Sequence, residues 1–567
     1  MTQHVLFVGG VALGSKAACR FKRLVPDAQA TLIDQDQFIS YGGCGIPFYV
    51  SGDVNDIADL QKTSFHMLRD ENFFNTCKDV NVRTRTRVER IDRQNKTVIV
   101  KGPDGATAEL AYDQLVLGTG SKPRQLNIPG ADLPGVFHVA NLHDAGAVKA
   151  RITAGEVSKA VIIGGGFIGL EMAEAMADMW EVDTTVVEYM NQIMPGFVSP
   201  VFARMAMNQM MAHGVHFFVD EQVTAIEGNG RVEAVVTNKR KIPADMVIMA
   251  VGVTPNVDLA RDAGLEIGPT GGIVVDAHLR TSDPSIFSGG DCAEIRNLLT
   301  GNPAYIPLGS MANRQGRVIG TNLAGGNAVF KGAVGSFAVK IFEAALAGAG
   351  LSITGALKAG FDAVSVQMAQ LDRAHFYPSK AMMFLEMVVD KKTRTVLGVQ
   401  GFGENGDAVV GRINTVAAIL EDRPTVDRLT NVEMAYSPPF SAALDILNAL
   451  ADVAENVLDG LLEPMEVTAF EKIWKNDADR RYLVVDCRAH ADGGPFAEKY
   501  PDRWLNIPQD EIKARVGELP KDRELILMCN TGTRAYEAQI NLRQMGVKTA
   551  GSVAGGMSVV NKYGVGV

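Results

Sequence analysis

The segment AVIIGGGFIGLEMAEAMA, residues 160–177, and the following TTVVEYM, residues 184–190, decide the fold of this chain. An apolar strand, a glycine-rich turn, a helix of small residues and a second strand ending in an acid form a dinucleotide-binding βαβ unit. Gly164, Gly166 and Gly169 let backbone N–H groups and the helix N-terminus approach a pyrophosphate. Glu188 is placed to bond ribose hydroxyls and to repel the extra phosphate of NADPH, which predicts a preference for NADH.

The same plan occurs a second time, at the start of the chain. VLFVGGVALGSKAACR, residues 5–20, supplies Gly9, Gly10 and Gly14, and TLIDQD, residues 31–36, ends its strand in Asp34. Val11 takes the position of the middle glycine, so this motif is less regular than the first. The repeat predicts two Rossmann-like units in an α/β protein.

Composition limits the class of protein. A chain of 567 residues is too long for one core and predicts three or four domains of about 150 residues each. A hydrophobic content of 47% indicates a globular protein, and a net charge of -10 argues against nucleic-acid and anionic-lipid partners. No apolar run spans a membrane and no signal segment begins the chain, so we expect a cytoplasmic protein without membrane contact. Six cysteines without CxxC spacing predict neither a disulfide scaffold nor a metal site.

Three further segments connect the two repeats. They are YDQLVLGTGSKP (112–123), MVIMAVGVTPN (246–256) and TSDPSIFSGGDCAE (281–294). In this order, with the two glycine turns, they resemble the motifs of the pyridine nucleotide-disulfide reductase superfamily. The resemblance implies bound FAD and NADH, with Asp291 on the flavin ribityl chain, Gly120 and Gly252 at the crossovers between the two domains, and Glu171 near the nicotinamide.

The predicted redox residue lies in FISYGGCGIPFYV, residues 38–50. Two-cysteine members of the superfamily carry CxxxxC here, but position 49 of this chain is Tyr, so Cys44 acts alone on an external sulfur partner. Flanking glycines expose its backbone, and a nearby helix N-terminus and the flavin are expected to favour its thiolate.

This segment also narrows the substrate class. With Ser40 retained, it resembles the single-cysteine branch, which includes coenzyme A disulfide reductases, persulfide and polysulfide reductases, and NADH oxidases and peroxidases. Gly43 stands where the branch commonly has Asn, which moves the expectation from coenzyme A disulfide toward persulfide and polysulfide. Ala12 stands where the peroxidases have a catalytic His, which argues against peroxide reduction.

Two tyrosines follow in the second half of the chain. HFYPSK (375–380) and MAYSPPFSAALDILN (434–448) resemble coenzyme A disulfide reductase motifs whose tyrosines reach the cysteine of a neighbouring subunit. The resemblance implies a homodimer with shared active sites, in which Tyr377 and Tyr436 stabilise or protonate a leaving thiolate.

The tail carries a second reactive cysteine. In ELILMCNTGTR, residues 524–534, a strand opens onto a loop whose backbone N–H groups can surround the sulfur of Cys529, and Arg534 completes an anion cradle. With Asp486 and Arg488, this CxxGxR loop resembles the rhodanese sulfurtransferase domain, and implies that Cys529 carries sulfane sulfur. Cys487 stands where that family usually has a small apolar residue; like Cys19, Cys77 and Cys292, it is expected to be buried.

The whole chain resembles fused coenzyme A disulfide reductase-rhodanese proteins, also described as NADH-dependent persulfide or polysulfide reductases. We expect an FAD domain (1–112 and 250–330), an NADH domain (113–249), an α+β dimerisation domain (331–449) and an α/β rhodanese domain (465–567). Bound coenzyme A is a further expectation, with Arg20, Arg23, Lys62 and Arg69 as candidate phosphate contacts. The alternatives are an NADH oxidase that uses a Cys44 sulfenic acid, and a sulfur carrier or trafficking protein.

Overall fold

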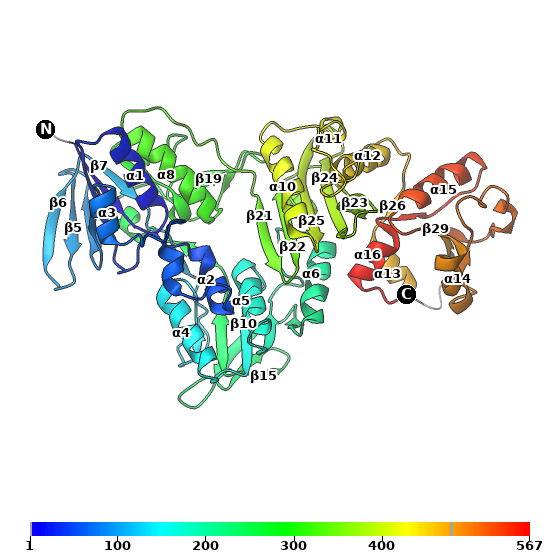
Figure 1. Ribbon diagram of the computed structural model, residues 1–567, viewed down its shortest axis with the longest axis horizontal. Coiled ribbons are helices and arrows are strands. Elements are labelled where there is room, and N and C mark those ends of the chain that lie inside the picture. The colour runs from blue at the N-terminus through cyan, green and yellow to red at the C-terminus, as the bar shows by residue number, and fades with distance from the viewer. Residues whose placement is uncertain (1–2, 477–479) are drawn as a thin grey trace. The chain divides into compact units, whose positions relative to one another are not determined.

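The computed structural model of this protein describes residues 3–476 and 480–567. The chain divides into two compact units, Met1–Asn191 with Gly214–Ala333, and Gln192–His213 with Val334–Val567. Figure 1 labels their elements. No helix of the described residues is both long enough and apolar enough to cross a bilayer.

The first unit begins with a five-stranded parallel sheet in the order β18-β7-β1-β2-β3. Val5 and Phe7 of β1 pack under α1 and α8, whereas Leu6 and Val8 face the antiparallel β4-β5-β6 sheet and α7, because successive strand residues point to opposite faces. The elements are β1 (His4–Val8), β2 (Gln29–Ile33), β3 (Asn81–Arg83), β4 (Arg87–Asp92), β5 (Thr97–Lys101), β6 (Thr107–Ala111), β7 (Gln114–Leu117), β18 (Ile286–Ser288), α1 (Leu13–Leu24), α3 (Glu71–Cys77), α7 (Asp258–Asp262) and α8 (Gly309–Leu323).

A second five-stranded parallel sheet, β12-β11-β10-β16-β9, completes the first unit. Its core joins Val161, Val187 and Val247 to the antiparallel β13-β14-β15 sheet. The short β8-β17 ladder pairs the two crossover segments. The elements are β8 (Ser121–Pro123), β9 (Val136–Phe137), β10 (Lys159–Ile163), β11 (Asp183–Val187), β12 (His216–Phe218), β13 (Val223–Glu227), β14 (Ala234–Thr237), β15 (Lys241–Pro243), β16 (Met246–Met249), β17 (Val253–Pro255), α2 (Ile46–Ser51), α4 (Leu142–Thr153) and α5 (Phe167–Ala177). The predicted pair of nucleotide-binding folds is confirmed.

The second unit contains a five-stranded antiparallel sheet in the order β21-β22-β25-β24-β23. Gly401 of β25 faces Val409 of α10, and its neighbour Gln400 accepts a hydrogen bond from the N–H of Ser199 beside α6, so the two helices cover opposite faces. The elements are β21 (Phe337–Ile341), β22 (Ala344–Gly350), β23 (Ala363–Leu371), β24 (Met382–Asp390), β25 (Val396–Gly403), α6 (Pro200–Ala212), α9 (Ile353–Lys358), α10 (Gly406–Leu420), α11 (Val426–Thr430) and α12 (Ile446–Leu458).

The tail of the second unit is a five-stranded parallel sheet in the order β26-β30-β29-β27-β28. Leu483, Val485, Leu525 and Leu527 form its core with α15. Asn208 of α6 donates hydrogen bonds from Nδ2 to the carbonyls of Lys562 and Tyr563, which connects α16 to α6. The elements are β26 (Pro464–Met465), β27 (Tyr482–Asp486), β28 (Trp504–Asn506), β29 (Glu524–Met528), β30 (Gly551–Val553), α13 (Val467–Lys475), α14 (His490–Lys499), α15 (Thr533–Gln544) and α16 (Gly556–Tyr563).

Candidate functional site

The two glycine turns begin α1 and α5 as predicted, and each requires glycine at its first position. Gly9 and Gly164 have φ values of +100° and +108°. A Cβ on Gly9 would lie 2.0 Å from the carbonyl oxygen of Gly118, and a Cβ on Gly164 would lie 2.4 Å from that of Ala250. Both turns therefore bring backbone against the neighbouring strand end, which only glycine permits.

The acids at the strand ends bond to their own glycine turns. Asp34 Oδ2 accepts the N–H of Gly10 at 2.7 Å, and Glu188 Oε2 accepts the N–H of Gly165 at 2.7 Å. Burial raises the pKa of Asp34. The two motifs thus share a hydrogen bond from the glycine turn to the acid as well as a sequence pattern. Each acid orients the turn at which a nucleotide would bind.

The glycines beyond these close contacts leave room for ligands. A Cβ on Gly166, Gly120 or Gly252 would meet no atom within 4 Å. Gly166 caps α5, whose first N–H groups lack partners inside the helix and can bind phosphate. The residues at both turns fit a dinucleotide.

Asp291 is held at the junction of the first sheet and α8. It lies in the short helix η3 (Gly290–Cys292), and Ser121 Oγ donates to its Oδ2 at 3.1 Å. The N–H of Gly290 donates to Gln315 Oε1 of α8 at 2.6 Å. Burial raises the pKa of Asp291, whereas the Ser121 hydrogen bond lowers it.

Cys44 lies close to the N-termini of α2 and α8 in the first unit. It is the middle residue of η1 (Gly43–Gly45), directly before α2, and it is exposed. A Cβ on Gly309, the first residue of α8, would lie 3.7 Å from Cys44 Sγ. The N–H of Ser40, whose φ is +50°, donates to the carbonyl of Gly10, which connects this segment to the first glycine turn. Four predicted features, Cys44, Ser40, Asp291 and the first turn, thus belong to one neighbourhood.

The surroundings of Cys44 raise the pKa of its thiol. Desolvation is the largest cause, and the carboxylates of Glu171 and Asp291 raise the pKa further. The backbone N–H groups of Gly309 and Cys44 act in the opposite direction. The N–H at the start of α8 thus acts in the expected direction and favours the thiolate, while desolvation and the two carboxylates have the larger effect on the pKa. The pKa of Glu171 is itself raised to about 7 by burial and by the neighbouring Glu174.

The structure brings the two tyrosine-bearing loops together in the second unit. The N–H of Ala374 donates to the carbonyl of Pro438 at 3.3 Å, and the buried Arg412 donates from Nη2 to the carbonyls of Asp372 and Phe440. Tyr436 is 53% exposed. Its phenol is available to a partner molecule.

Cys529 lies at the carboxyl end of the tail sheet, directly after β29. The N–H of Gly532 donates to its Sγ at 3.1 Å, which matches the predicted backbone cradle, and α15 with Arg534 begins one residue later. Asp486 accepts hydrogen bonds from Arg488 and from Trp504 Nε1, so these buried residues support the strand beside the loop.

The candidate coenzyme A contacts lie on α1 and on residues 62–69 of the first unit. Arg20 and Arg23 are on α1, where Arg20 Nε donates to Thr321 Oγ1. Lys62 forms ion pairs with Asp56 and Asp59, and Arg69 donates to backbone carbonyls.

The other cysteines follow the expected burial only in part. Cys292 and Cys487 are buried, but Cys19 is only half-buried, and Cys77 is exposed at the end of α3, where the expectation of burial is wrong. Cys77 ends a short helix with one buried residue, so its face is not covered.

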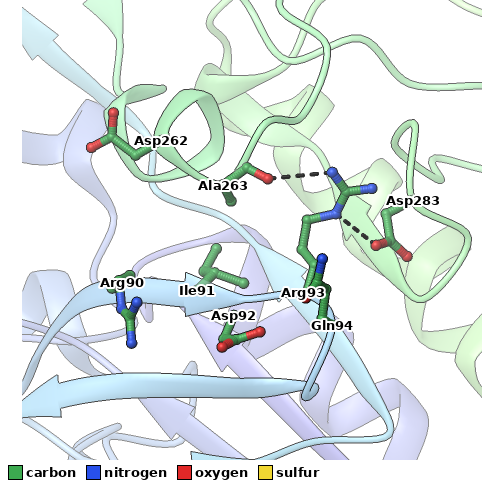
Figure 2. Close-up of a pocket in the computed structure, with 8 residues that line it drawn as sticks. All are labelled: Arg90, Ile91, Asp92, Arg93, Gln94, Asp262, Ala263 and Asp283. Atoms are coloured by element: carbon green, nitrogen blue, oxygen red, sulfur yellow. Dashed lines mark hydrogen bonds and ion pairs between the residues drawn. The ribbon is translucent and has the colours of Figure 1, made fainter.

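A groove of about 480 Å³ opens beside the end of β4, and Figure 2 shows its lining. Arg93 crosses it, with Nε donating to Asp283 at 2.8 Å and Nη1 to the carbonyl of Ala263 at 3.3 Å. These bonds connect the β4-β5 turn to the end of α7 and to the segment before β18. No predicted site residue lines the groove.

Sequence reasoning missed Gly309, Ser121 and Arg412. Gly309 and Ser121 contact predicted residues that are distant in sequence, so no local motif marks them. Ser121 does lie inside the quoted crossover motif, and its hydroxyl could have been noticed there. Arg412 occurs in an ordinary amphipathic helix, α10, and gives no signal.

Comparison with known proteins covers nearly the whole chain. Residues 3–316 match the family model of pyridine nucleotide-disulphide oxidoreductases, residues 336–447 that of their dimerisation domain, and residues 469–562 that of rhodanese-like domains. The chain is 33% identical over 449 residues to an NAD(P)H sulfur oxidoreductase (CoA-dependent) of Pyrococcus abyssi, covering 79% of this chain and 97% of that protein.

Two solved structures match in fold along the full length. An NAD-dependent persulfide reductase from A. fulgidus has a TM-score of 0.92 and 36% identity, covering 98% of this chain and 100% of that one. Reduced Bacillus anthracis CoADR-RHD has a TM-score of 0.89 and 29% identity, covering 99% and 98%. The predicted fold class, two nucleotide-binding domains followed by dimerisation and rhodanese domains, is confirmed.

Proposed function

Because this chain belongs to the pyridine nucleotide-disulphide oxidoreductase family, we propose that it is an FAD- and NADH-dependent reductase of sulfur-sulfur bonds. Its substrates are persulfides, polysulfides and the disulfide or persulfide of coenzyme A. The observation that carries this proposal is Cys44, an exposed thiol beside the α8 N-terminus with Tyr in place of a second redox cysteine at position 49.

Gly9, Gly10, Gly14, Asp34 and Asp291 would hold FAD at the first turn, and bound FAD would supply electron-pair transfer between NADH and sulfur. The second turn, Gly164 to Gly169 with Glu188, binds NADH. Gly120 and Gly252 leave space along the crossover ladder for the two nucleotides to meet. Glu171, whose pKa is raised by burial, would lie near the nicotinamide of bound NADH, and its carboxylate raises the pKa of Cys44.

Cys44 attacks the substrate as a thiolate. Its sulfur bonds to one substrate sulfur, and the other leaves as a thiol or as hydrosulfide. Two electrons from NADH then break the new S–S bond, so one persulfide, one NADH and one proton yield one thiol, one hydrogen sulfide and one NAD⁺. The Gly309 N–H stabilises the Cys44 thiolate as it is released.

The chain acts as a homodimer. Residues 336–447 match the dimerisation model, and the exposed Tyr436 and the nearby Tyr377 assist the leaving sulfur at the partner's Cys44. Arg20, Arg23, Lys62 and Arg69 contact the phosphates of coenzyme A. Cys529, with Arg534, collects sulfane sulfur and delivers it to Cys44, directly or through a small thiol, and tethering raises the local concentration of the donor.

Anaerobic NADH oxidation by full-length protein tests the proposal, with coenzyme A persulfide, inorganic polysulfide and coenzyme A disulfide as separate substrates. We expect turnover in the wild type, its loss in Cys44→Ser and its retention in Cys77→Ser, which removes an exposed cysteine elsewhere. Equal turnover in Cys44→Ser contradicts the proposal.

The same assay separates the alternatives. An NADH oxidase would consume oxygen faster than any sulfur substrate. That function would not explain the rhodanese-like domain at residues 469–562. A sulfur carrier transfers persulfide from Cys529 to an acceptor at a rate that NADH does not change.

A further inference from the structure

The two buried cysteines of the tail occupy matching positions on neighbouring strands. β27 and β29 are parallel, and their last paired residues are Asp486 and Met528. Cys487 and Cys529 come next, and the N–H of Cys487 donates to the carbonyl of Met528 at 2.8 Å. The pairing of β27 with β29 therefore continues to the two cysteines.

Both cysteines also face the same side of the sheet. Residues two apart on a strand share a face, and Leu483, Val485 and Cys487 belong to one apolar cluster with Leu525, Leu527 and Cys529. Neighbouring strands lie about 4.8 Å apart, within the roughly 4.4–6.8 Å between Cα atoms that a disulfide spans. The two thiols can therefore form a disulfide with little movement of the backbone.

The two sulfurs are electrostatically coupled. A negative charge on Cys529 raises the pKa of Cys487, after the larger effect of burial and together with Asp486, whereas Arg534 lowers it. Each cysteine is 1% exposed, so water does not screen the pair. The thiol at position 487 therefore responds directly to the charge on Cys529.

We propose that Cys487 is a resolving thiol, which attacks a sulfane-loaded Cys529 and converts the pair into a disulfide with release of sulfide. A sulfane donor first transfers its sulfur to Cys529, which becomes a persulfide. The Cys487 thiolate then bonds to Cys529 Sγ, and the bond between Sγ and the outer sulfur breaks. The outer sulfur leaves with the electron pair as hydrosulfide, so it is reduced while the two cysteines are oxidised.

Two equivalents of a small thiol return the pair to its reduced form and become a small disulfide. This reset rests on the proposed function, because the reductase half would use NADH to reduce that disulfide. The formation of the Cys487–Cys529 bond does not depend on Cys44 or NADH.

The surroundings predict how the reaction depends on pH. Since the pKa of Cys487 is raised, only a small fraction is thiolate at neutral pH, and that fraction rises about tenfold per pH unit below the pKa. We expect disulfide formation to accelerate by nearly this factor for each pH unit, or nearly a hundredfold between pH 7 and pH 9. At neutral pH the Cys529 persulfide lasts long enough for an external thiol to take its outer sulfur.

The test uses the full-length chain with Cys44→Ser and Cys77→Ser, which removes the two exposed cysteines. The reduced protein receives inorganic polysulfide without NADH, is quenched with an alkylating reagent at set times, and is analysed by peptide mass spectrometry. We expect a peptide pair joined through Cys487 and Cys529, and sulfide release beyond that of donor decay. In Cys487→Ala and Cys487→Val the same treatment leaves an alkylated persulfide on Cys529.

Two variants guard against a folding artefact, because Ala removes volume and Val restores apolar packing. A persulfide on Cys529 that is equally stable in the parent and in both variants, or a disulfide from Cys529 to another cysteine, overturns the proposal. Normal NADH-dependent turnover in a Cys487 variant with intact Cys44 leaves the proposed function standing, so the two failures are distinguishable.

Discussion

Gly309 lies beside Cys44 Sγ, and its backbone N–H lowers the pKa of the thiol against the effects of desolvation, Glu171 and Asp291. Gly309→Pro removes that N–H at the first position of α8, where proline is tolerated, and Leu308 before it already has the extended conformation that proline requires. A hydrogen bond to a charged group contributes about 1.5–3 kcal/mol, so we expect the Cys44 pKa to rise by about 1–2 units.

The rate of iodoacetamide alkylation against pH, followed at Cys44 by peptide mass spectrometry, measures this shift. Gly309→Ala is the matched control, because it keeps the N–H and its Cβ makes an ordinary contact 3.7 Å from the sulfur. Identical pH profiles for the Pro and Ala variants would show that the N–H has no influence.

Glu188 is expected to set the nucleotide preference. Its Oε1 and Oε2 accept the N–H groups of Met190 and Gly165, which fixes the charge at the end of β11. Glu188→Gln removes that charge at constant size, and we expect kcat/KM for NADPH relative to NADH to rise by about tenfold or more, because like-charge repulsion is lost.

Asp34→Asn, the same change in the first motif, should weaken FAD retention and leave the nucleotide preference unaltered. A preference shifted by Asp34→Asn but not by Glu188→Gln would reverse the assignment of the two turns.

Glu386 makes the second unit less stable as pH rises. The side chain is 1% exposed on β24, its Oε1 has no hydrogen-bond partner in the described residues, and Gln367 donates to Oε2 at 2.6 Å. Burial raises its pKa from 4.5 to about 7. The folded state therefore holds the proton more tightly, so this contribution to stability is complete below about pH 4.5 and is lost as pH rises through 7.

Glu386→Gln removes the buried charge. At pH 8 we expect the variant to be more stable than the wild type by about 3 kcal/mol, and near pH 5 the difference should be small. Thermal unfolding of the full chain at both pH values measures this, with the exposed Glu433→Gln as control. A variant that is less stable at pH 8 contradicts the prediction.

Arg412 and Asp445 form a buried ion pair that holds the Tyr436 loop. Their Nη2 and Oδ2 atoms are 2.6 Å apart, and the side chains are 9% and 2% exposed. Arg412→Ala leaves Asp445 buried without its partner, so we expect a loss of about 3–5 kcal/mol of stability. Unfolding temperature and limited proteolysis within residues 434–445 measure the effect. Arg428→Ala, an exposed arginine on α11, should change neither, and equal behaviour of the two variants would exclude a role for the pair.

The nucleotide turns, Cys44 and the Cys529 loop could be predicted because each function is encoded over a short stretch. A glycine between a strand and a helix has few backbone alternatives, so Gly164 and Gly9 reveal their turns without any tertiary information. The acids at the strand ends follow from the same local geometry, and the structure adds that Glu188 and Asp34 also bond their own turns.

The rest depends on contacts between distant segments. Gly309 reaches Cys44, and Cys487 is aligned with Cys529, only because apolar faces pack α8 on the first sheet and place β27 beside β29. The sequence did not indicate, for the same reason, that desolvation and two distant carboxylates raise the Cys44 pKa against the effect of the local N–H groups. The sequence by itself determined the domains' folds and indicated the candidate reactive residues, because both depend on local motifs. Only the tertiary structure decided which groups surround each sulfur, because burial and charge act through space and leave no pattern along the chain.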